Sequence, residues 1–241
     1  MDIIIEVQGL VKKYGKLTAL DNISFSINKG EIFGLLGPNG AGKSTFISIL
    51  TTISRPSSGD IIVSGFSASR QSDKIKKIIG YVPQDIALYP MLSGMDNLKF
   101  WAGMYGLKGS TKKERIKEVL SVVGLEDRIR DRVDTYSGGM KRRLNIAVSL
   151  LHHPEVLVMD EPTVGVDVKS RKLIFDAVKK LKEKNTTVIF TSHYIDEMEW
   201  ACDRMAIINS GKLEALGTSE ELKKSYNRES VEEILNQLNE E

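Results

Sequence analysis

The chain is poor in cysteine and proline, and each shortage argues against a class of protein. Only one cysteine, Cys202, occurs among the 241 residues. It cannot close an internal disulfide or supply a CxxC metal or redox pair, so we expect a reducing compartment. The six prolines stand beside 20 glycines, 41% hydrophobic residues and 27% charged residues. This composition argues against collagen-like, disordered and coiled-coil chains and favours a globular fold.

The chain also lacks an excess of one charge and a long apolar run. Its 34 Lys and Arg residues and 32 Asp and Glu residues give a net charge of +2, without the concentrated positive field of a nucleic-acid-binding protein. No apolar run approaches the roughly 18 residues of a membrane span. Acidic residues stand at the N-terminus, where a signal peptide has a basic region. We therefore expect a cytoplasmic protein that binds no nucleic acid and does not cross a membrane by itself.

What the chain does contain is a set of short apolar segments that predict an α/β fold. Alternating residues over 23–27 predict a strand with one wet face, and the apolar run over 32–36 predicts a strand buried on both faces. Strands over 156–159 and 187–190, with a helix over 169–184 between them, predict a right-handed βαβ unit. The run Asn-Ser-Gly-Lys at 209–212 predicts a hairpin between two further strands.

A block of helical periodicity from about 95 to 152 interrupts these strands, with apolar residues spaced to bury one face of each helix. The predicted organisation is a single domain over 1–241, with a catalytic core in 1–84 and 153–218. An inserted helical subdomain occupies 85–152, and a helical tail occupies 219–241. Val231, Ile234, Leu235 and Leu238 form one stripe of that tail. We expect the stripe to dock on its own domain, with partner binding as the alternative.

The first motif that carries chemistry is GPNGAGKST at 37–45, which fits the pattern G-x-x-x-x-G-K-[ST] between a predicted strand and a helical stretch. Glycines let backbone N–H groups close around a polyphosphate, and the following helix N-terminus adds its positive dipole end. Lys43 can then reach the β- and γ-phosphates, while Ser44 can hold Mg²⁺. The predicted nucleotide-binding residues are Gly37, Asn39, Gly40, Ala41, Gly42, Lys43, Ser44 and Thr45.

A second motif is the apolar strand VLVM at 156–159, which ends in two adjacent carboxylates, Asp160 and Glu161. Ligands of open α/β folds bind where the parallel strands end. Asp160 can therefore meet the Mg²⁺, and Glu161 can polarise an attacking water. Coupled to the glycine-rich loop, this pair predicts a nucleoside triphosphatase.

A third motif is Ser137-Gly138-Gly139, which stands just before an apolar helical stretch. Ser137 is therefore a candidate N-cap, and the two glycines expose helix-end amides to an anion. This would be a second phosphate-binding surface.

With these motifs in this order, residues 5–218 resemble the nucleotide-binding subunits of ATP-binding cassette (ABC) transporters. Tyr14 matches the aromatic residue that stacks on adenine, and Gln84 matches a glutamine between the core and the helical subdomain. The run 136–140, Tyr-Ser-Gly-Gly-Met, matches the family signature, whose commonest form has Leu and Gln at its ends. Residues 164–167 resemble the loop after the catalytic Glu, and His193 resembles the switch histidine.

The resemblance implies a phosphate-loop NTPase core with a mixed sheet, an N-terminal antiparallel β part and an inserted helical subdomain. It implies that Glu161, His193 and Gln84 are catalytic. Ser44, Gln84 and Asp160 would hold Mg²⁺, and Tyr14, Ser137, Gly138 and Gly139 would join the loop in binding ATP.

The resemblance also implies partners. Two subunits, identical or paired, would close head-to-tail around two MgATP, each signature completing the other's site. Together they would drive a separate membrane permease from the cytoplasmic face, and residues 136–144 and 201–208 resemble the drug-exporter branch. The mixed apolar and polar segment 85–92 would form the groove for the permease, or its apolar residues would fill the core instead.

Two other functions remain open at this stage. A soluble ABC ATPase could act in assembly or regulation without a permease, although the coiled-coil insertion of the repair type is absent from this sequence. A phosphate-loop kinase would have no reason for the Ser-Gly-Gly run. Co-purification with a multi-span membrane protein separates the transporter from both.

Overall fold

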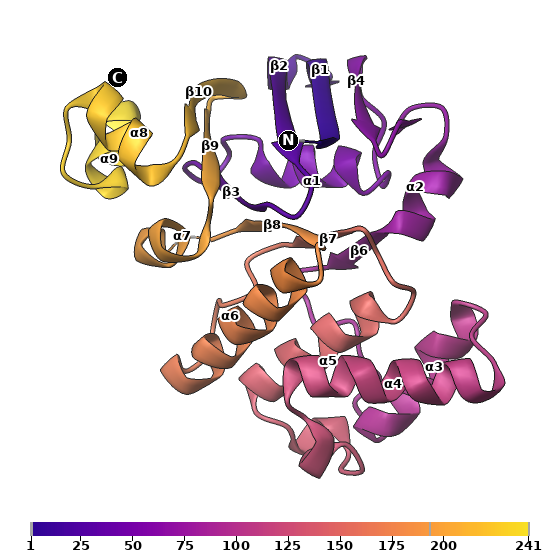
Figure 1. Ribbon diagram of the computed structural model, residues 1–241. Helices are drawn as coiled ribbons and strands as arrows, with labels where there is room; N and C mark the ends of the chain where they lie inside the picture. The colour runs from indigo at the N-terminus through magenta and orange to yellow at the C-terminus, as the bar shows by residue number, and fades with distance from the viewer. Residues whose placement is uncertain (1, 193, 241) are drawn as a thin grey trace.

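A six-stranded sheet forms the centre of the computed structural model, which describes residues 2–192 and 194–240 (Figure 1). The strand order is β10-β9-β3-β8-β7-β6, and every pair is parallel except β9 with β10. The strands are β3 Ile32–Leu36, β6 Ile79–Val82, β7 Val156–Met159, β8 Thr187–Thr191, β9 Arg204–Asn209 and β10 Lys212–Gly217. The predicted parallel pair β7 and β8, its crossover helix and the β9–β10 hairpin are all confirmed.

Both faces of this sheet are buried, as the apolar run at 32–36 predicts. Alternate residues of β3 enter different cores: Phe33 and Leu35 on one face, and Ile32 and Leu36 on the other. Side chains of a strand alternate between faces, so a strand covered on both sides has no polar position left. All five residues of β3 are accordingly buried.

The first core packs an antiparallel sheet of order β2-β1-β4-β5 against one face of the central sheet, with helix α1 (Lys43–Leu50) between them. Its strands are β1 Ile3–Tyr14, β2 Leu17–Asn28, β4 Ser58–Val63 and β5 Phe66–Ser67, and helix α2 spans Ser72–Ile78. Strand β2 is longer than the alternating pattern at 23–27 because it pairs with β1 as a hairpin whose last partners are Tyr14 and Leu17. This hairpin places its turn beside the glycine-rich loop.

The second core covers the opposite face and contains the helices inserted between β6 and β7, at the lower right of Figure 1. These are α3 Gly94–Met104, α4 Gly109–Val123 and α5 Gly138–Leu150, with 3₁₀ turns at Glu126–Arg128 and Val133–Thr135. Ser93 caps α3 by accepting a hydrogen bond from the Asp96 N–H. The predicted helical block is therefore present, and it begins at residue 94.

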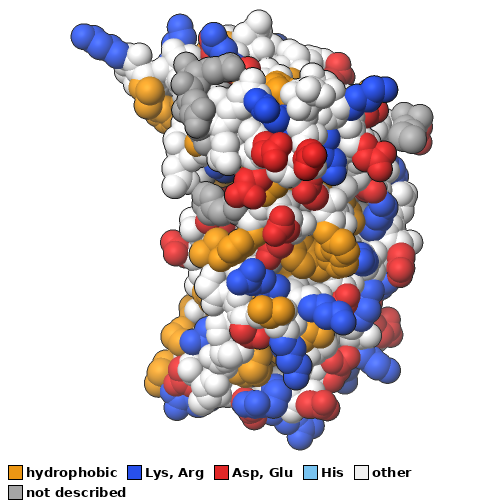
Figure 2. Space-filling view, turned by 90° about the vertical axis from the view of Figure 1, so that its left-hand side faces the viewer, with side chains coloured by type: hydrophobic (Ala, Val, Ile, Leu, Met, Phe, Trp, Pro, Cys, Tyr) orange, Lys and Arg blue, Asp and Glu red, His pale blue; other side chains and the backbone are white. Residues whose placement is uncertain are grey.

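The C-terminal part completes this core with α6 Val168–Glu183, α7 Ile195–Ala201, α8 Ser219–Tyr226 and α9 Val231–Glu240. The predicted stripe of α9 is buried against its own domain, and the Asn209 amide donates a hydrogen bond to the Leu238 carbonyl. Figure 2 views the face that carries these helices and shows basic and acidic side chains interspersed over its lower half. In the described part of the chain, no helix is both long and apolar enough to pass through a membrane.

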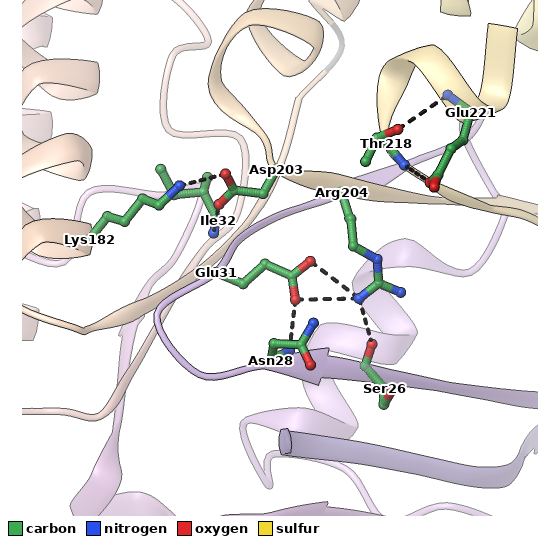
Figure 3. A network of polar contacts seen from close by, with 9 residues as sticks. All are labelled: Ser26, Asn28, Glu31, Ile32, Lys182, Asp203, Arg204, Thr218 and Glu221. Atoms are coloured by element: carbon green, nitrogen blue, oxygen red, sulfur yellow. Dashed lines mark hydrogen bonds and ion pairs between the residues drawn. The ribbon is translucent and has the colours of Figure 1, made fainter. Parts of the chain in front are cut away.

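Polar contacts hold the start of β9 beside the start of its parallel neighbour β3 (Figure 3). The Arg204 guanidinium donates to the Glu31 carboxylate and to the Ser26 carbonyl, and Asp203 accepts from the Ile32 N–H at 2.9 Å. The other carboxylate oxygen of Asp203 pairs with Lys182 on α6. Glu31 is buried, and the Arg204 guanidinium compensates the charge of its carboxylate.

Candidate functional site

A cavity of about 510 Å³ is lined by the β1–β2 turn, the loop before α1 and the segment after β7. Tyr14, a residue that is 49% exposed, lines the cavity together with Glu161. The volume lies in the range of small-molecule sites. The cavity thus gathers eight of the predicted residues, which are Tyr14, Asn39, Gly40, Gly42, Lys43, Ser44, Thr45 and Glu161.

The glycine-rich loop wraps around the Lys43 ammonium, which donates to the carbonyls of Gly37 at 2.6 Å and Pro38 at 2.9 Å. Lys43 begins α1 and is only 7% exposed. Burial lowers its pKa from the ordinary value, while the negative charges of Glu161 and Asp160 act in the opposite direction. Two backbone carbonyls of the loop therefore hold the ammonium in place.

Two glycines of this loop occupy positions that a side chain could not. A Cβ atom at Gly37 would lie 2.0 Å from the Ile208 carbonyl oxygen, and one at Gly42 would lie 2.5 Å from that of Ala19. Both also have positive φ, 147° and 111°. Gly37 and Ala41 do not line the cavity. They support its loop, with Ala41 accepting a hydrogen bond from the Gly211 N–H of the hairpin turn.

Asp160 and Glu161 follow β7 at the edge where β6 and β8 also end, because Val82, Met159 and Phe190 lie in register. The Thr191 hydroxyl donates to Asp160 at 2.8 Å and accepts from the Glu161 N–H at 3.0 Å. Glu161 has a φ of 48°, which is uncommon for a residue with a side chain. One hydroxyl of the neighbouring strand thus holds the Asp160 carboxylate and the backbone of Glu161.

Gln84 joins the site from the end of β6, and its amide donates to a carboxylate oxygen of Glu161 at 3.0 Å. His193 lies outside the described residues, so its catalytic role stays a prediction. The candidate Mg²⁺ ligands Ser44, Gln84 and Asp160 are hydroxyl, amide and carboxylate groups, and oxygen donors of these kinds suit Mg²⁺. Ser44 lines the cavity and Gln84 contacts Glu161, so this donor set fits a metal beside a bound polyphosphate.

Arg142 on α5 is a further residue of this region, and it is not among the site residues predicted from the sequence. Its guanidinium donates to the carbonyls of Pro83 and Gln84, both at 2.7 Å, and the residue is 5% exposed. The backbone at Gln84 is therefore fixed to α5. A buried arginine usually has a hydrogen-bonding partner within the protein. The Gln84 carbonyl that Arg142 contacts is 58 residues away in the sequence.

Ser137 and Gly138 of the signature lie on a surface away from the cavity, whereas Gly139 is buried, contrary to the prediction that both glycines face an anion. Ser137 caps α5, accepting from the Met140 N–H at 3.3 Å, as its position predicts. Ser137 and Gly138 are exposed, and among the described residues that line the cavity none belongs to 137–139. Tyr136, which replaces the common Leu, is buried and donates its hydroxyl to the Arg128 carbonyl at 2.7 Å. The substitution therefore leaves no buried polar atom unpaired.

The segment 85–92 exposes most of its apolar side chains. Tyr89, Met91 and Leu92 are 44%, 68% and 39% exposed, whereas Leu88 packs on the second core. Asn97 holds the backbone at Tyr89 with one hydrogen bond to its N–H and one from its own amide to the carbonyl. The interpretation that these residues all fill the core is therefore wrong for three of the four.

The fold and the site together define a phosphate-loop nucleotide-binding protein. The family model described as ABC transporter matches residues 20–164 of the chain. The chain belongs to this family, and it is an ATPase of ABC transporters, the subunit that binds ATP.

Three known proteins illustrate the similarity. The linearmycin resistance ATP-binding protein LnrL of Bacillus subtilis is 51% identical over 219 residues, which are 91% of this chain and 70% of LnrL. The structure of cbiO1 from Clostridium perfringens, part of the ABC transporter complex cbiONQ, has a TM-score of 0.85 at 29% identity and covers 99% of this chain and 95% of its own. The dimeric cassette MJ0796 bound to ADP and Pi has a TM-score of 0.78 at 27% identity, covering 89% and 98%.

Proposed function

We propose that this ATPase hydrolyses MgATP in a dimer and so drives a separate membrane permease that exports an antibiotic-like compound. The observation that carries the proposal is the cavity that joins Tyr14, the glycine-rich loop and Glu161, while Ser137 and Gly138 are exposed elsewhere. LnrL, by its name a resistance protein, supports export. The cbiONQ complex and the MJ0796 dimer support the two kinds of partner.

The proposed roles follow from the chemistry of each side chain. Bound MgATP supplies the phosphoanhydride bond and a metal charge that neutralises phosphate oxygens. Lys43 and the loop amides bind the phosphates, Tyr14 stacks on the base, and Ser44, Asp160 and Gln84 hold the metal. Glu161 accepts the proton of the attacking water, and Gln84 orients the Glu161 carboxylate. His193 is the proposed contact to the terminal phosphate.

We further propose how the chain is divided into functional parts. Residues 1–84 and 153–218 form the catalytic core, residues 85–152 form the helical signature subdomain, and 219–241 form a helical tail. The subunit lies at the cytoplasmic face of the membrane through its permease. Purification with a multi-span membrane protein tests this proposal, and a subunit that never associates with one would instead be a soluble ABC ATPase.

Subunit mixing tests whether the site is completed by a second subunit. A homodimer of Lys43→Ala chains carries one lesion in each composite site, and so does a homodimer of Ser137→Arg chains. In the mixed dimer one site carries both lesions and the other carries none. We expect the mixture to recover part of the parent ATPase rate, measured as phosphate release. Mixed dimers no more active than either variant, with subunit exchange shown by labelled chains, would indicate a site within one chain.

A charge in the exposed segment tests the permease surface. Tyr89→Asp and Met91→Asp should leave the subunit folded and hydrolysing ATP but abolish its association with the permease and transport, because a buried charge is costly to desolvate. Melting, ATPase and co-purification measure the three properties. Ile53→Asp, at an apolar residue 68% exposed outside this segment, is the matched control. Normal transport by both Tyr89→Asp and Met91→Asp would exclude the groove.

A further inference from the structure

Helix α7 carries a carboxylate that joins two segments of the candidate site. Glu197 accepts a hydrogen bond from the Thr163 hydroxyl at 2.7 Å and a longer one from the Ser192 hydroxyl at 3.3 Å, both on the same oxygen. Thr163 stands two residues after Glu161, and Ser192 directly precedes position 193. One carboxylate therefore connects the chain just beyond the proposed base with the chain just before the proposed switch histidine.

The contacts of Glu197 are shielded from water. The side chain of Glu197 is 13% exposed, and the residues Thr163 and Ser192 are 0% and 4% exposed. Charge-assisted hydrogen bonds in such surroundings are stronger than those between neutral groups and hold a fixed geometry. Glu197 is thus placed to fix both segments rather than to face solvent.

The second oxygen of Glu197 is also occupied. Arg171 on α6 lies 3.4 Å from it and donates through its Nε to the Val166 carbonyl at 2.9 Å. The Arg171 guanidinium also lies 4.5 Å from the centre of the Tyr194 ring. The pair Glu197–Arg171 therefore contacts the segment after Glu161 at Thr163 and Val166, and the segment around 193 at Ser192 and Tyr194.

We propose that Glu197 is a positioning residue for ATP hydrolysis, which locks the segment after Glu161 to the segment that carries His193. Together with Thr191, which bonds Asp160 and Glu161, it provides two cross-links between the ends of β7 and β8. In this role Glu197 acts through the two segments that it joins, and it contacts neither the nucleotide nor the attacking water. It sets the angle at which the base meets its substrate. The inference rests on the proposed catalytic function of Glu161.

The test is the ATPase rate of the full chain carrying Glu197→Gln or Thr163→Val. Glu197→Gln keeps the size of the side chain but removes the charge opposite Arg171, and Thr163→Val removes the hydroxyl donor. We expect kcat to fall by tenfold to about a hundredfold, the loss known for small misplacements in a catalytic site. The KM for ATP should stay within about threefold, since neither side chain contacts the nucleotide in the proposed site.

Two variants separate positioning from mere stability. Thr163→Ser keeps the hydroxyl but removes the methyl group and so leaves a small cavity. It should nevertheless keep most of the parent kcat. Glu199→Gln makes the matched substitution two residues along α7, where the carboxylate bonds Ser219 and pairs with Lys223 of α8 instead. Glu199→Gln should keep the parent kcat, and melting curves should show all variants folded.

Each outcome decides between the alternatives. A parent-like kcat in folded Glu197→Gln and Thr163→Val overturns the inference, as does a Thr163→Ser variant as slow as Thr163→Val. A fall in kcat for Glu199→Gln equal to that of Glu197→Gln would show a general effect of α7 and also overturn it. Glu161→Gln is measured alongside. If Glu161→Gln hydrolyses ATP at the parent rate, the proposed base is wrong. If Glu161→Gln is inactive while Glu197→Gln keeps the parent kcat, the positioning role of Glu197 is rejected and the proposed base stands.

Discussion

Glu161→Gln should bind MgATP as the parent does but hydrolyse it more slowly by about 10²–10⁴, the usual worth of a positioned general base. The amide keeps the shape and can still contact Gln84, which lies 3.0 Å away in the parent. It cannot accept the proton of the attacking water. The stalled complex should accumulate as an ATP-bound dimer, visible as a larger species in size-exclusion chromatography with MgATP.

The control for this variant is Glu155→Gln on the residue that precedes β7. Glu155 lies at the opposite end of the same strand and bonds the Ser64 hydroxyl at 2.8 Å. Its substitution should therefore leave hydrolysis unchanged. A Glu161→Gln variant with the parent rate would move the base to another residue, and His193→Ala would then be the next variant to measure.

Lys43→Ala should lose ATP binding or turnover while the chain stays folded. The ammonium of Lys43 is the cation enclosed by the glycine-rich loop, and its two carbonyl contacts would be replaced by phosphate contacts in the proposed complex. Because Lys43 is buried, the truncation also leaves a small void, so a modest fall in melting temperature is expected. Calorimetric titration with MgATP and phosphate release measure the effect.

Lys76→Ala on α2 is the comparison for Lys43→Ala. The Lys76 side chain is 59% exposed and pairs with Asp73 of its own helix, so its loss should change neither affinity nor rate. Unchanged affinity together with unchanged turnover in Lys43→Ala would remove the assignment of the glycine-rich loop.

Some of the molecule was predictable because the signal is local. The pattern at 37–45 fixes a loop geometry through glycines and a following helix, and the structure has Lys43 at the start of α1. The cap at Ser137 and the buried strand at 32–36 are local in the same way. Each rests on backbone conformation or on the alternation of side chains over a few residues.

Other features depend on partners far away in the chain. The Arg142 bonds to Pro83 and Gln84 span nearly 60 residues, and the Glu197 bond to Thr163 spans 34. No short sequence pattern marks these contacts, because an arginine or a glutamate in a helix usually lies on the protein surface.

The sequence by itself thus determined the class of fold, the glycine-rich loop, the carboxylates after β7 and the resemblance to ABC transporter ATPases. Only the tertiary structure decided which residues hold those groups in place: Thr191 on Asp160 and Glu161, Arg142 on Gln84, and Glu197 on Thr163 and Ser192. The physical reason is the range of the interactions. Turn geometry and side-chain periodicity act over a few residues, whereas these hydrogen bonds form only after parallel strands have aligned their ends.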